Sequence, residues 1–361
     1  MADKSIYSVI KGSGRYIPEV IKKNSDFCDT EFYDADGQKI DKTNEEIIEK
    51  FQQITGIDER RYVSDDLVAS DIGFFAAEDA LKSSGIDKET LDYIIVAHNF
   101  GDVKHDNRQA DFMPSLASRI KHKLKIENPY TVAYDLPFGC PGWVQAMIQA
   151  DYYIKSGDAK KILVIGTETL SRVADPHDRD GMIYSDGAGA VILEAKESEE
   201  PIGILSHKTR TDTLDHAYLL WNGPSNNPER DRKEMFIKMH GRKLYEYALI
   251  NVPQLIKDTV DKIGLEFTKV KKVLIHQANE KMDEAMLKRL FRLYHIKDIP
   301  KDIMPMTIAK FGNNSIATLP ILFDMLIKGE LEDHSLVKDD HFVFASVGAG
   351  MNVNAIVYKM S

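Results

Sequence analysis

Apolar and polar residues alternate along this chain in a pattern that repeats. Residues 70–85, SDIGFFAAEDALKSSG, carry apolar side chains at helical spacing and end at a glycine. Residues 91–102, LDYIIVAHNFGD, contain a short apolar run that enters a polar loop. The spacing predicts a helix that stops at Gly85, followed by a buried strand. Helices and strands that alternate in this way are typical of an α/β fold.

The same helix and strand pattern occurs once more in each half of the chain. Residues 143–168 predict a mostly apolar helix that stops at Gly157, followed by the strand KILVIG. Residues 315–348 predict a buried helix that ends at Gly329, again before a strand. A related unit is therefore present near the middle and near the end of the chain.

A turn of small residues beside a strand accompanies each of these units. The two turns lie in SDGAGAVILEA and in SVGAGMNVNAIVY. With 361 residues the chain is also longer than a single hydrophobic core usually serves, which is about 250 to 300 residues. We therefore predict two diverged repeats with a boundary near residue 196, which gives the units 1–196 and 197–361.

Two polar segments, 24–44 and 205–235, interrupt this pattern. The second reads SHKTRTDTLDHAYLLWNGPSNNPERDRKEMF at 206–236 and is rich in turn-forming residues. Long segments without periodicity inside compact proteins usually serve a site. Both are predicted to be loops or caps over a functional region.

Composition and charge restrict the class of protein. Apolar residues make up 43% and charged residues 29% of the chain, close to globular averages. The net charge of -10 argues against a nucleic-acid-binding protein, because phosphate recognition needs a basic face. Residues 1–20 lack the apolar core of a signal peptide, and no window has the roughly 20 apolar residues of a membrane span. We expect a cytoplasmic protein with no membrane contact.

The chain has only two cysteines, Cys28 and Cys140, so a disulfide framework is not expected. No paired Cys and His spacing indicates zinc. His177, in ADPHDRD, superficially suggests a metal ligand but has no spaced partners, so no metal is expected. Cys28 is interpreted as a spare thiol.

Cys140 lies in the segment PFGCPGW, immediately before Pro141. Proline suits the first position of a helix, which would place Cys140 at the N-cap. There the helix dipole and unpaired N–H groups would lower the pKa of the thiol and favour the thiolate. The alternative is a small apolar core residue, which is the commoner role of a free cysteine.

His276 and Asn313 are the other two candidates. His276 follows the apolar run Val273–Ile275, and α/β sheets gather their chemistry at the ends of such strands. Asn313 lies in FGNNSIATLP, between a glycine and a helix start near Asn314 that corresponds to Cys140 in the first repeat. Each residue alone also has an ordinary explanation, a structural histidine and an N-cap or turn asparagine.

Together, these segments resemble the β-ketoacyl-acyl-carrier-protein synthase III family over nearly the whole chain. Any one of the motifs is weak, but their occurrence in family order is specific. They are GSGRYIPEVIKKNSD, TGIDERRYV, YDLPFGCPGW, DRDGMIYSDGAGAVI, HQANEKM, FGNNS and the final GAG.

The resemblance implies a thiolase-like fold of two repeats in αβαβα layers, and a homodimeric acyltransferase of the kind used in fatty acid biosynthesis. Cys140 would take an acyl group from a thioester, and the backbone amides of Cys140 and Ala349 would hold the oxyanion. His276 and Asn313 would then bind a malonyl-type thioester while it loses CO₂ and condenses. Acyl-coenzyme A or acyl-carrier-protein thioesters serve as substrates, and no cofactor is implied. The acyl pocket would be bounded by Met113, Trp143, Gly348 and Gly350.

The chain departs from the family pattern at several of these places. Lys50 and Ile54 appear where family members that use coenzyme A carry a planar clamp for adenine, which favours carrier-protein donors. Met113 stands where the family places an aromatic residue that reaches across the dimer, so a roomier pocket is expected. These departures support an alternative function, a ketosynthase that joins two β-oxoacyl thioesters in the biosynthesis of dialkylresorcinol-type secondary lipids.

A basic stripe is predicted on the helix after HQAN. Lys281, Lys288 and Arg292 share one side of it, with Arg289 adjacent. Because acyl carrier proteins are acidic, this stripe would dock them on an acidic enzyme. A solvated helix face with no partner is the alternative.

A cysteine hydrolase and a non-catalytic partner protein are the alternatives from other classes. A cysteine hydrolase would also use Cys and His, but the apolar helices around Cys140 disfavour access of water to an acyl-enzyme. A non-catalytic partner of an active homologue would have no chemical need for Cys140, His276 and Asn313 together.

Overall fold

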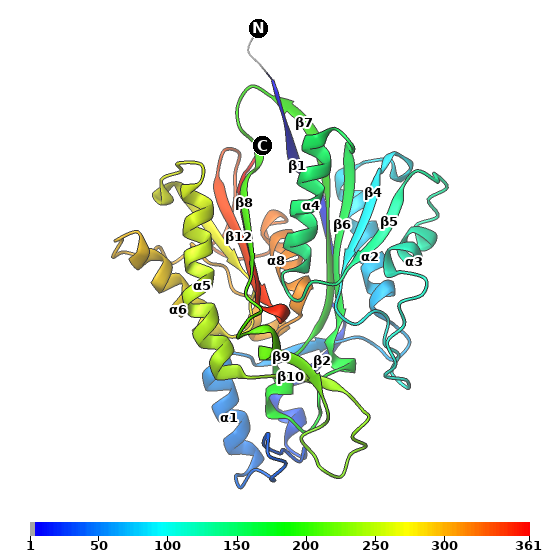
Figure 1. Cartoon of the computed structure of the whole chain (residues 1–361), viewed down its shortest axis with the longest axis vertical. Coiled ribbons are helices and arrows are strands. Elements are labelled where there is room, and N and C mark those ends of the chain that lie inside the picture. The colour runs from blue at the N-terminus through cyan, green and yellow to red at the C-terminus, as the bar shows by residue number, and fades with distance from the viewer. Residues whose placement is uncertain (1–3) are drawn as a thin grey trace.

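Two β-sheets, one from each half of the chain, organise the structure, a computed structural model that describes residues 4–361 (Figure 1). In the first sheet, β4, β5 and β6 are parallel, and β7 and β1 are added antiparallel at one side. The strand order is β1 (Ser5–Tyr16), β7 (Asp186–Ser198), β6 (Lys161–Thr169), β4 (Tyr93–Ala97) and β5 (Val132–Leu136).

The second sheet repeats this order with one strand fewer. Its strands are β8 (Gly203–Thr211), β13 (Asn352–Lys359), β12 (His341–Gly348) and β11 (Val270–Ile275), which occupy the places of β1, β7, β6 and β4. Two small antiparallel pairs complete the strands. They are β2 (Val20–Lys23) with β3 (Glu59–Tyr62), and β9 (Leu220–Gly223) with β10 (Phe236–Met239).

The common strand order supports the predicted pair of repeats. The division at residue 196 stays a prediction, and β7 itself continues two residues further, to Ser198.

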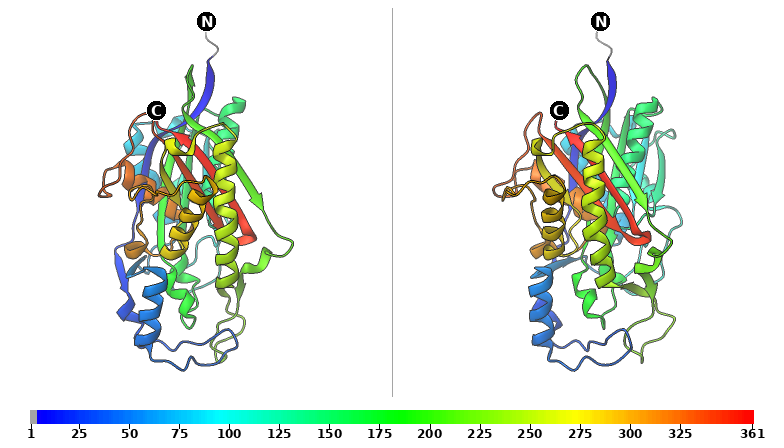
Figure 2. Two further views of the ribbon diagram at one scale, coloured as in Figure 1. Left: turned by 90° about the vertical axis from the view of Figure 1, so that its left-hand side faces the viewer. Right: turned by 60° about the vertical axis from the view of Figure 1, so that its left-hand side comes forward.

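Helices lie between the sheets and on both outer faces (Figures 1 and 2). Between the sheets are α4 (Gly142–Ser156) and α8 (Thr318–Ile327). On the first sheet are α2 (Ala69–Ser84) and α3 (Leu116–Lys123), and on the second are α5 (Gly241–Asp261) and α6 (Glu280–Leu293). The remaining helices are α1 (Asn44–Thr55) and α7 (Ile308–Phe311). Short 3-10 turns are η1 (Asn24–Phe27), η2 (Lys88–Thr90), η3 (Leu170–Arg172), η4 (Arg179–Ile183), η5 (Ala217–Leu219), η6 (Phe267–Lys269), η7 (Ser315–Ala317) and η8 (Ala349–Met351).

Three apolar cores join these layers. One surrounds α4 and α8 and contacts both sheets, one lies under α2 and α3, and one lies under α5 and α6. Full burial of one aliphatic or aromatic side chain contributes about 1.5–3 kcal/mol, so dozens of such residues hold the layers together. The predicted αβαβα layering of an α/β fold is confirmed.

The predicted helix ends are also confirmed. α2 ends at Ser84, and α4 ends at Ser156. The residues that follow them, Gly85 and Gly157, have φ angles of 66° and 84°. This left-handed conformation favours glycine, which is why the sequence could mark both ends.

The two polar segments, which are far apart in sequence, contact each other. Nδ2 of Asn226 donates a hydrogen bond of 3.0 Å to the carbonyl oxygen of Tyr33. The prediction that 205–235 is one long loop is wrong in part, because β8 extends through Thr211 and β9 begins at Leu220. Pairing of β8 with β13 supplies backbone hydrogen bonds that the polar sequence did not reveal.

Asp283 on α6 generates a prediction about stability. It is fully buried, and neither carboxyl oxygen has a hydrogen-bond partner within residues 4–361. Burial raises its pKa well above the usual range. The folded protein therefore holds this proton at pH values where the unfolded chain, with a pKa of about 3.9, has released it. The contribution of this proton to the free energy of unfolding is therefore complete below the pKa of the unfolded chain. It decreases as the pH rises towards the pKa of the folded protein.

We expect Asp283→Asn to raise the melting temperature, and to raise it more at pH 8 than at pH 5. The asparagine has a similar shape and no proton to lose. Thermal unfolding of both proteins across this pH range checks the expectation. A difference in melting temperature that stays constant with pH would contradict it.

Candidate active site

Cys140 lies in the turn between β5 and α4, where the parallel strands of the first sheet end. The carbonyl oxygen of Gly139 accepts a hydrogen bond of 2.9 Å from the amide of Gly142, and that of Pro141 accepts one from Gln145. Pro141 has helical φ and ψ angles of −70° and −1° and is itself the N-cap. The predicted N-cap position of Cys140 is therefore wrong by one residue, because the Gly139–Gly142 turn precedes the helix.

The thiol of Cys140 is less acidic than the sequence predicted. Removal from water raises its pKa to about 11, and the charge of Glu168 adds to this rise. The hydroxyl of Ser315 opposes it by donating a hydrogen bond of 3.2 Å to Sγ. The expected lowering of the thiol pKa is thus wrong, since desolvation outweighs the amino end of α4. Cys140 rests as a neutral thiol.

His276 immediately follows β11, and its backbone amide donates a hydrogen bond of 2.9 Å to the carbonyl oxygen of Ala345. The side chain is buried, and Nδ1 has no hydrogen-bond partner in the described chain. Burial lowers the pKa of the imidazole to about 4. At neutral pH the ring is therefore uncharged, with one N–H donor and one nitrogen acceptor.

Asn313 is held in the loop between α7 and η7. Its amide donates to the carbonyl oxygen of Ile183 at 2.8 Å, and its own carbonyl oxygen accepts from the amide of Ser185 at 2.9 Å. Oδ1 accepts a further hydrogen bond of 2.9 Å from the amide of Ser315. Since the side-chain oxygen is engaged in this way, the Nδ2 group is the part of the amide that is free to donate.

The turn at residues 348–350 packs against the backbone of Cys140. A Cβ on Gly348 would lie 2.5 Å from the amide nitrogen of Cys140, and one on Gly139 would lie 2.9 Å from that of Ala349. Only glycine permits such a close approach. Among residues 4–361, neither the Cys140 amide nor the Ala349 amide has a hydrogen-bond acceptor. Two backbone donors are therefore available beside the sulfur.

One cavity of about 270 Å³ brings the predicted residues together. Cys140, His276, Asn313, Gly348 and Ala349 all contribute to its wall. The remaining wall is largely apolar and comes from Asn99, Phe100, Leu170, Ile183, Tyr184, Leu220, Trp221, Asn222, Ile237, Met239, Leu244, Ala248, Ala278, Met282, Ser315 and Val347. Neutral hydrogen-bond donors are thus concentrated in an apolar, desolvated space.

A second cavity, of about 440 Å³, continues this space towards the surface and shares five wall residues with it. Lys50 and Ile54, the two departures noted in the sequence, both line this outer cavity on α1. Further cations in its wall are Lys42, Arg179 and Arg242.

The other residues predicted to bound the acyl pocket lie elsewhere. Trp143 is 1% exposed and packs edge-on against Phe344, with ring centroids 5.3 Å apart, in the core around α4. Its place in the first turn of α4 turns the ring into that core and away from the cavity wall. Met113 is 88% exposed and contributes nothing to the cavity of its own chain. Gly350, with a φ angle of 75°, lies beside Asn352.

The predicted basic stripe lies on the exposed side of α6, the outermost helix over the second sheet (Figure 2). Lys281, Lys288, Arg289 and Arg292 are all exposed. Lys288 also pairs with Glu284 at 3.1 Å, so the stripe is not purely cationic.

Within the described residues, no group of three or more His, Cys, Asp or Glu side chains is arranged to hold a metal ion. Nδ1 of His177 lies 2.9 Å from the carbonyl oxygen of Glu31, so this residue ties two loops together. None of the helices in residues 4–361 combines the length and apolarity that crossing a membrane requires.

Sequence reasoning missed Ser315, Asn99 and Tyr184, which also line the cavity. Ser315 belongs to the GNNS motif and was detectable from it. Asn99 and Tyr184 had no signal, because each follows or precedes an apolar strand in the way that many surface residues do. The hydroxyl of Tyr184 is buried and has no hydrogen-bond partner in the described chain.

Comparison with known proteins identifies relatives over almost the whole length. Residues 134–213 match the family 3-oxoacyl-[acyl-carrier-protein] synthase III, and residues 260–360 match its C-terminal region. A β-ketoacyl-[acyl-carrier-protein] synthase III from Vibrio vulnificus is 34% identical over 324 residues, which are 90% of this chain and 91% of the relative. The corresponding protein of Staphylococcus haemolyticus is 32% identical over 97% of this chain and 98% of its own. The crystal structure of 3-oxoacyl-[acyl-carrier-protein] synthase III from Aquifex aeolicus is similar with a TM-score of 0.78 and 28% identity, and covers 98% of this chain and 99% of that one.

Proposed function

Because the chain belongs to the 3-oxoacyl-[acyl-carrier-protein] synthase III family, it is a condensing acyltransferase, and we propose that Cys140, His276 and Asn313 perform its two chemical steps. The observation that carries this proposal is the single cavity in which the thiol, the neutral imidazole and the side-chain amide meet beside two free backbone amides.

In the first step, Sγ of Cys140 attacks the carbonyl carbon of an acyl thioester. The oxyanion that forms accepts hydrogen bonds from the amides of Cys140 and Ala349. Because the thiol starts protonated, its proton has to leave as the sulfur–carbon bond forms, and it passes to the sulfur of the departing carrier. The carrier thiol then departs with a proton, and the acyl group remains on Cys140.

In the second step, a malonyl-type thioester replaces the departed carrier. Its carbonyl oxygen accepts hydrogen bonds from the N–H of His276 and from Nδ2 of Asn313. When the carboxylate leaves as CO₂, the electron pair becomes an enolate whose oxygen these two donors stabilise. The enolate carbon forms a bond to the acyl carbonyl carbon, the bond to sulfur breaks, and the released thiolate of Cys140 takes a proton from water.

The thioester carriers approach through the outer cavity. Lys50 and Ile54 in its wall are not planar, but Phe51, Tyr245, Arg179 and Arg242 in the same wall are, so the preference for a carrier-protein donor over coenzyme A comes from the sequence departures and not from this wall. Ala278 and Met282, at the start of α6, belong to both cavities, so the basic stripe begins at the entrance. An acidic carrier protein docked on Lys281, Lys288 and Arg292 would deliver its arm there.

The active protein is proposed to be a homodimer. β5 is an edge strand of the first sheet, and Val132 at its start is 47% exposed. Tyr130, shortly before β5, and Met113, shortly before α3, are 85% and 88% exposed. A second copy paired along β5 would cover these side chains and satisfy the strand edge. The cytoplasmic location and the absence of a cofactor stay predictions.

A second candidate reaction, the joining of two β-oxoacyl thioesters, is favoured by Tyr184. Its ring lines the cavity and its buried hydroxyl has no partner in the described chain. An unpaired buried hydroxyl costs roughly 1–3 kcal/mol, which a carbonyl oxygen on the acyl chain would recover. An unsubstituted acyl chain offers no such acceptor.

The roles of the three residues are tested by intact-protein mass after mixing with acyl thioesters. We expect an acyl adduct on the wild type and none on Cys140→Ser. His276→Ala and Asn313→Ala should both retain the adduct, and their condensation rates should fall at least about 100-fold, since each removes an enolate donor. If either variant condensed at the wild-type rate, its proposed role would be wrong.

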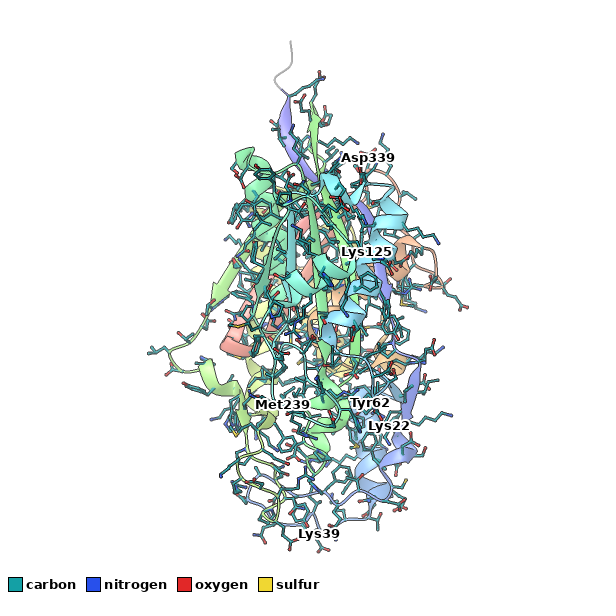
Figure 3. All side chains as sticks on the ribbon, turned by 90° about the vertical axis from the view of Figure 1, so that its right-hand side faces the viewer. Lys22, Lys39, Tyr62, Lys125, Met239 and Asp339 are labelled. Atoms are coloured by element: carbon teal, nitrogen blue, oxygen red, sulfur yellow. The ribbon has the colours of Figure 1, made fainter. Side chains whose placement is uncertain are left out.

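The docking surface is tested by charge reversal. Lys281→Glu combined with Lys288→Glu should raise the KM for a carrier-bound acyl donor about tenfold and leave acylation by coenzyme A thioesters unchanged. Lys82→Glu with Lys125→Glu is the matched control, on a face remote from α6 where Figure 3 shows Lys125. Equal effects of the two pairs would remove the docking assignment.

The second candidate is tested by donor preference. If the Tyr184 hydroxyl binds a β-oxo group, Tyr184→Phe should lower kcat/KM for β-oxoacyl donors about tenfold and leave that for unsubstituted acyl donors unchanged or higher. A uniform loss for both donor types would assign Tyr184 to packing alone.

A further inference from the structure

A buried carboxyl group that the proposed reaction does not use lies near the nucleophile. Glu168 is the penultimate residue of β6 and is 2% exposed. In the described chain no Lys or Arg forms an ion pair with it, and Oε2 has no hydrogen-bond partner. Buried carboxyl groups without a partner are costly, so this one calls for an explanation.

Three hydrogen bonds connect Glu168 to Cys140. Oε1 of Glu168 accepts from the backbone amide of Asn99. Nδ2 of Asn99 donates to Oγ of Ser315 at 3.4 Å. Oγ of Ser315 in turn donates to Sγ of Cys140 at 3.2 Å. The hydrogen bonds therefore lead from the first half of the chain to Ser315 in the second half, and from there to the sulfur of Cys140 in the first half.

The fold explains why these residues meet. β4 and β6 are parallel neighbours in which Ala97 lies opposite Gly166, so Asn99 and Glu168 each follow two residues later at the same sheet edge. Ser315 has a φ angle of 50°, which costs a residue with a side chain of order 1–3 kcal/mol. Strain of this kind persists only where the surroundings fix the residue, and here it places Oγ against the sulfur.

We propose that Glu168 is a positioning residue for Cys140: its carboxyl group fixes Asn99 and, through Asn99, the Ser315 hydroxyl. The proposal rests on the assignment of Cys140 as the nucleophile. Glu168 itself does not touch substrate in this scheme.

The protonation state of Glu168 matters because of its neighbours. Burial raises its pKa to about 8, and Asp186 on β7 contributes to the rise. The other titratable group coupled to it is Cys140, before α4. Below pH 8 the carboxyl group is mostly neutral and adds no charge near the sulfur. Above pH 8 its negative charge opposes formation of the thiolate.

The experiment measures the reactivity of the thiol directly, without any acyl substrate. In a Cys28→Ser background, Cys140 is the single cysteine of the chain. The rate of alkylation by iodoacetamide is followed by intact mass from pH 6 to pH 10, for the wild type and for Glu168→Gln. Because no thioester is involved, a failure of the proposed condensation leaves this measurement intact.

We expect the two proteins to react within about twofold of each other at pH 6.5, where both side chains are neutral and both accept from Asn99. At pH 9.5 Glu168→Gln should react roughly tenfold faster, since it lacks the negative charge that raises the pKa of the Cys140 thiol. Curves that coincide at every pH would overturn the electrostatic part of the proposal.

The positioning part is tested by breaking the connection. Asn99→Ala keeps Glu168 and removes the middle link, and Glu168→Ala removes the first. Both should slow alkylation at pH 6.5 several-fold, to the rate of Ser315→Ala, in which the hydrogen bond to sulfur is absent. Asp283→Asn is the matched control for loss of a buried carboxyl group and should react as the wild type does. If Asn99→Ala also reacts as the wild type does, Glu168 does not position the nucleophile.

Discussion

Desolvation of the sulfur of Cys140 is the constraint on which the rest of the site depends. The helices α4 and α8 meet between the two sheets, and Cys140, Asn313 and Ser315, which precede them, contribute to the wall of a cavity with almost no charge at rest. In such a space the thiol of Cys140 keeps its proton and the imidazole of His276 stays neutral, because each charged form would lose its hydration. Charge therefore arises only as bonds change, where the amide donors are already in place.

Close packing supplies those donors. The two oxyanion-binding amides belong to the backbone, and they lie beside the sulfur because Gly139 and Gly348 have no Cβ to keep the turns apart. The side chain of Asn313 is also fixed by the backbone. The amide of Ser315 donates a hydrogen bond to Oδ1, which leaves Nδ2 free to donate to the substrate. Donors fixed in this way need no reorganisation when an oxyanion or enolate forms.

The sequence predicted the elements well where local chemistry determines them. Helices ended at Gly85 and Gly157 because a left-handed residue was required there, and the two repeats followed from the recurrence of one pattern. It failed where the three-dimensional surroundings decide. The position of Cys140 next to a helix start suggested an acidic thiol, but burial, which no local pattern reports, has the larger effect.

The pocket residues illustrate the same limit. Trp143 was assigned to the acyl pocket from the family resemblance, yet its place in the first turn of α4 directs its side chain into the core around that helix. Asn99 follows β4, Glu168 lies near the end of β6 and Tyr184 precedes β7, and they share one edge of the sheet because the parallel strands β4 and β6 end there and the antiparallel strand β7 begins there. Contacts of this kind depend on register, which a single sequence does not specify.

The walls of the inner and outer cavities differ in charge. The chain carries a net charge of -10, yet the wall of the outer cavity has the cations Lys42, Lys50, Arg179 and Arg242 against the carboxyl groups of Glu46 and Asp180, while the inner cavity is lined by neutral groups. An acidic carrier is therefore attracted to the entrance, and an uncharged acyl chain enters the inner cavity at low cost. The buried carboxyl group of Glu168 fits this division only as a neutral acid. An ionised carboxylate at that place would oppose the negative charge that develops on and beside the sulfur as its bonds change.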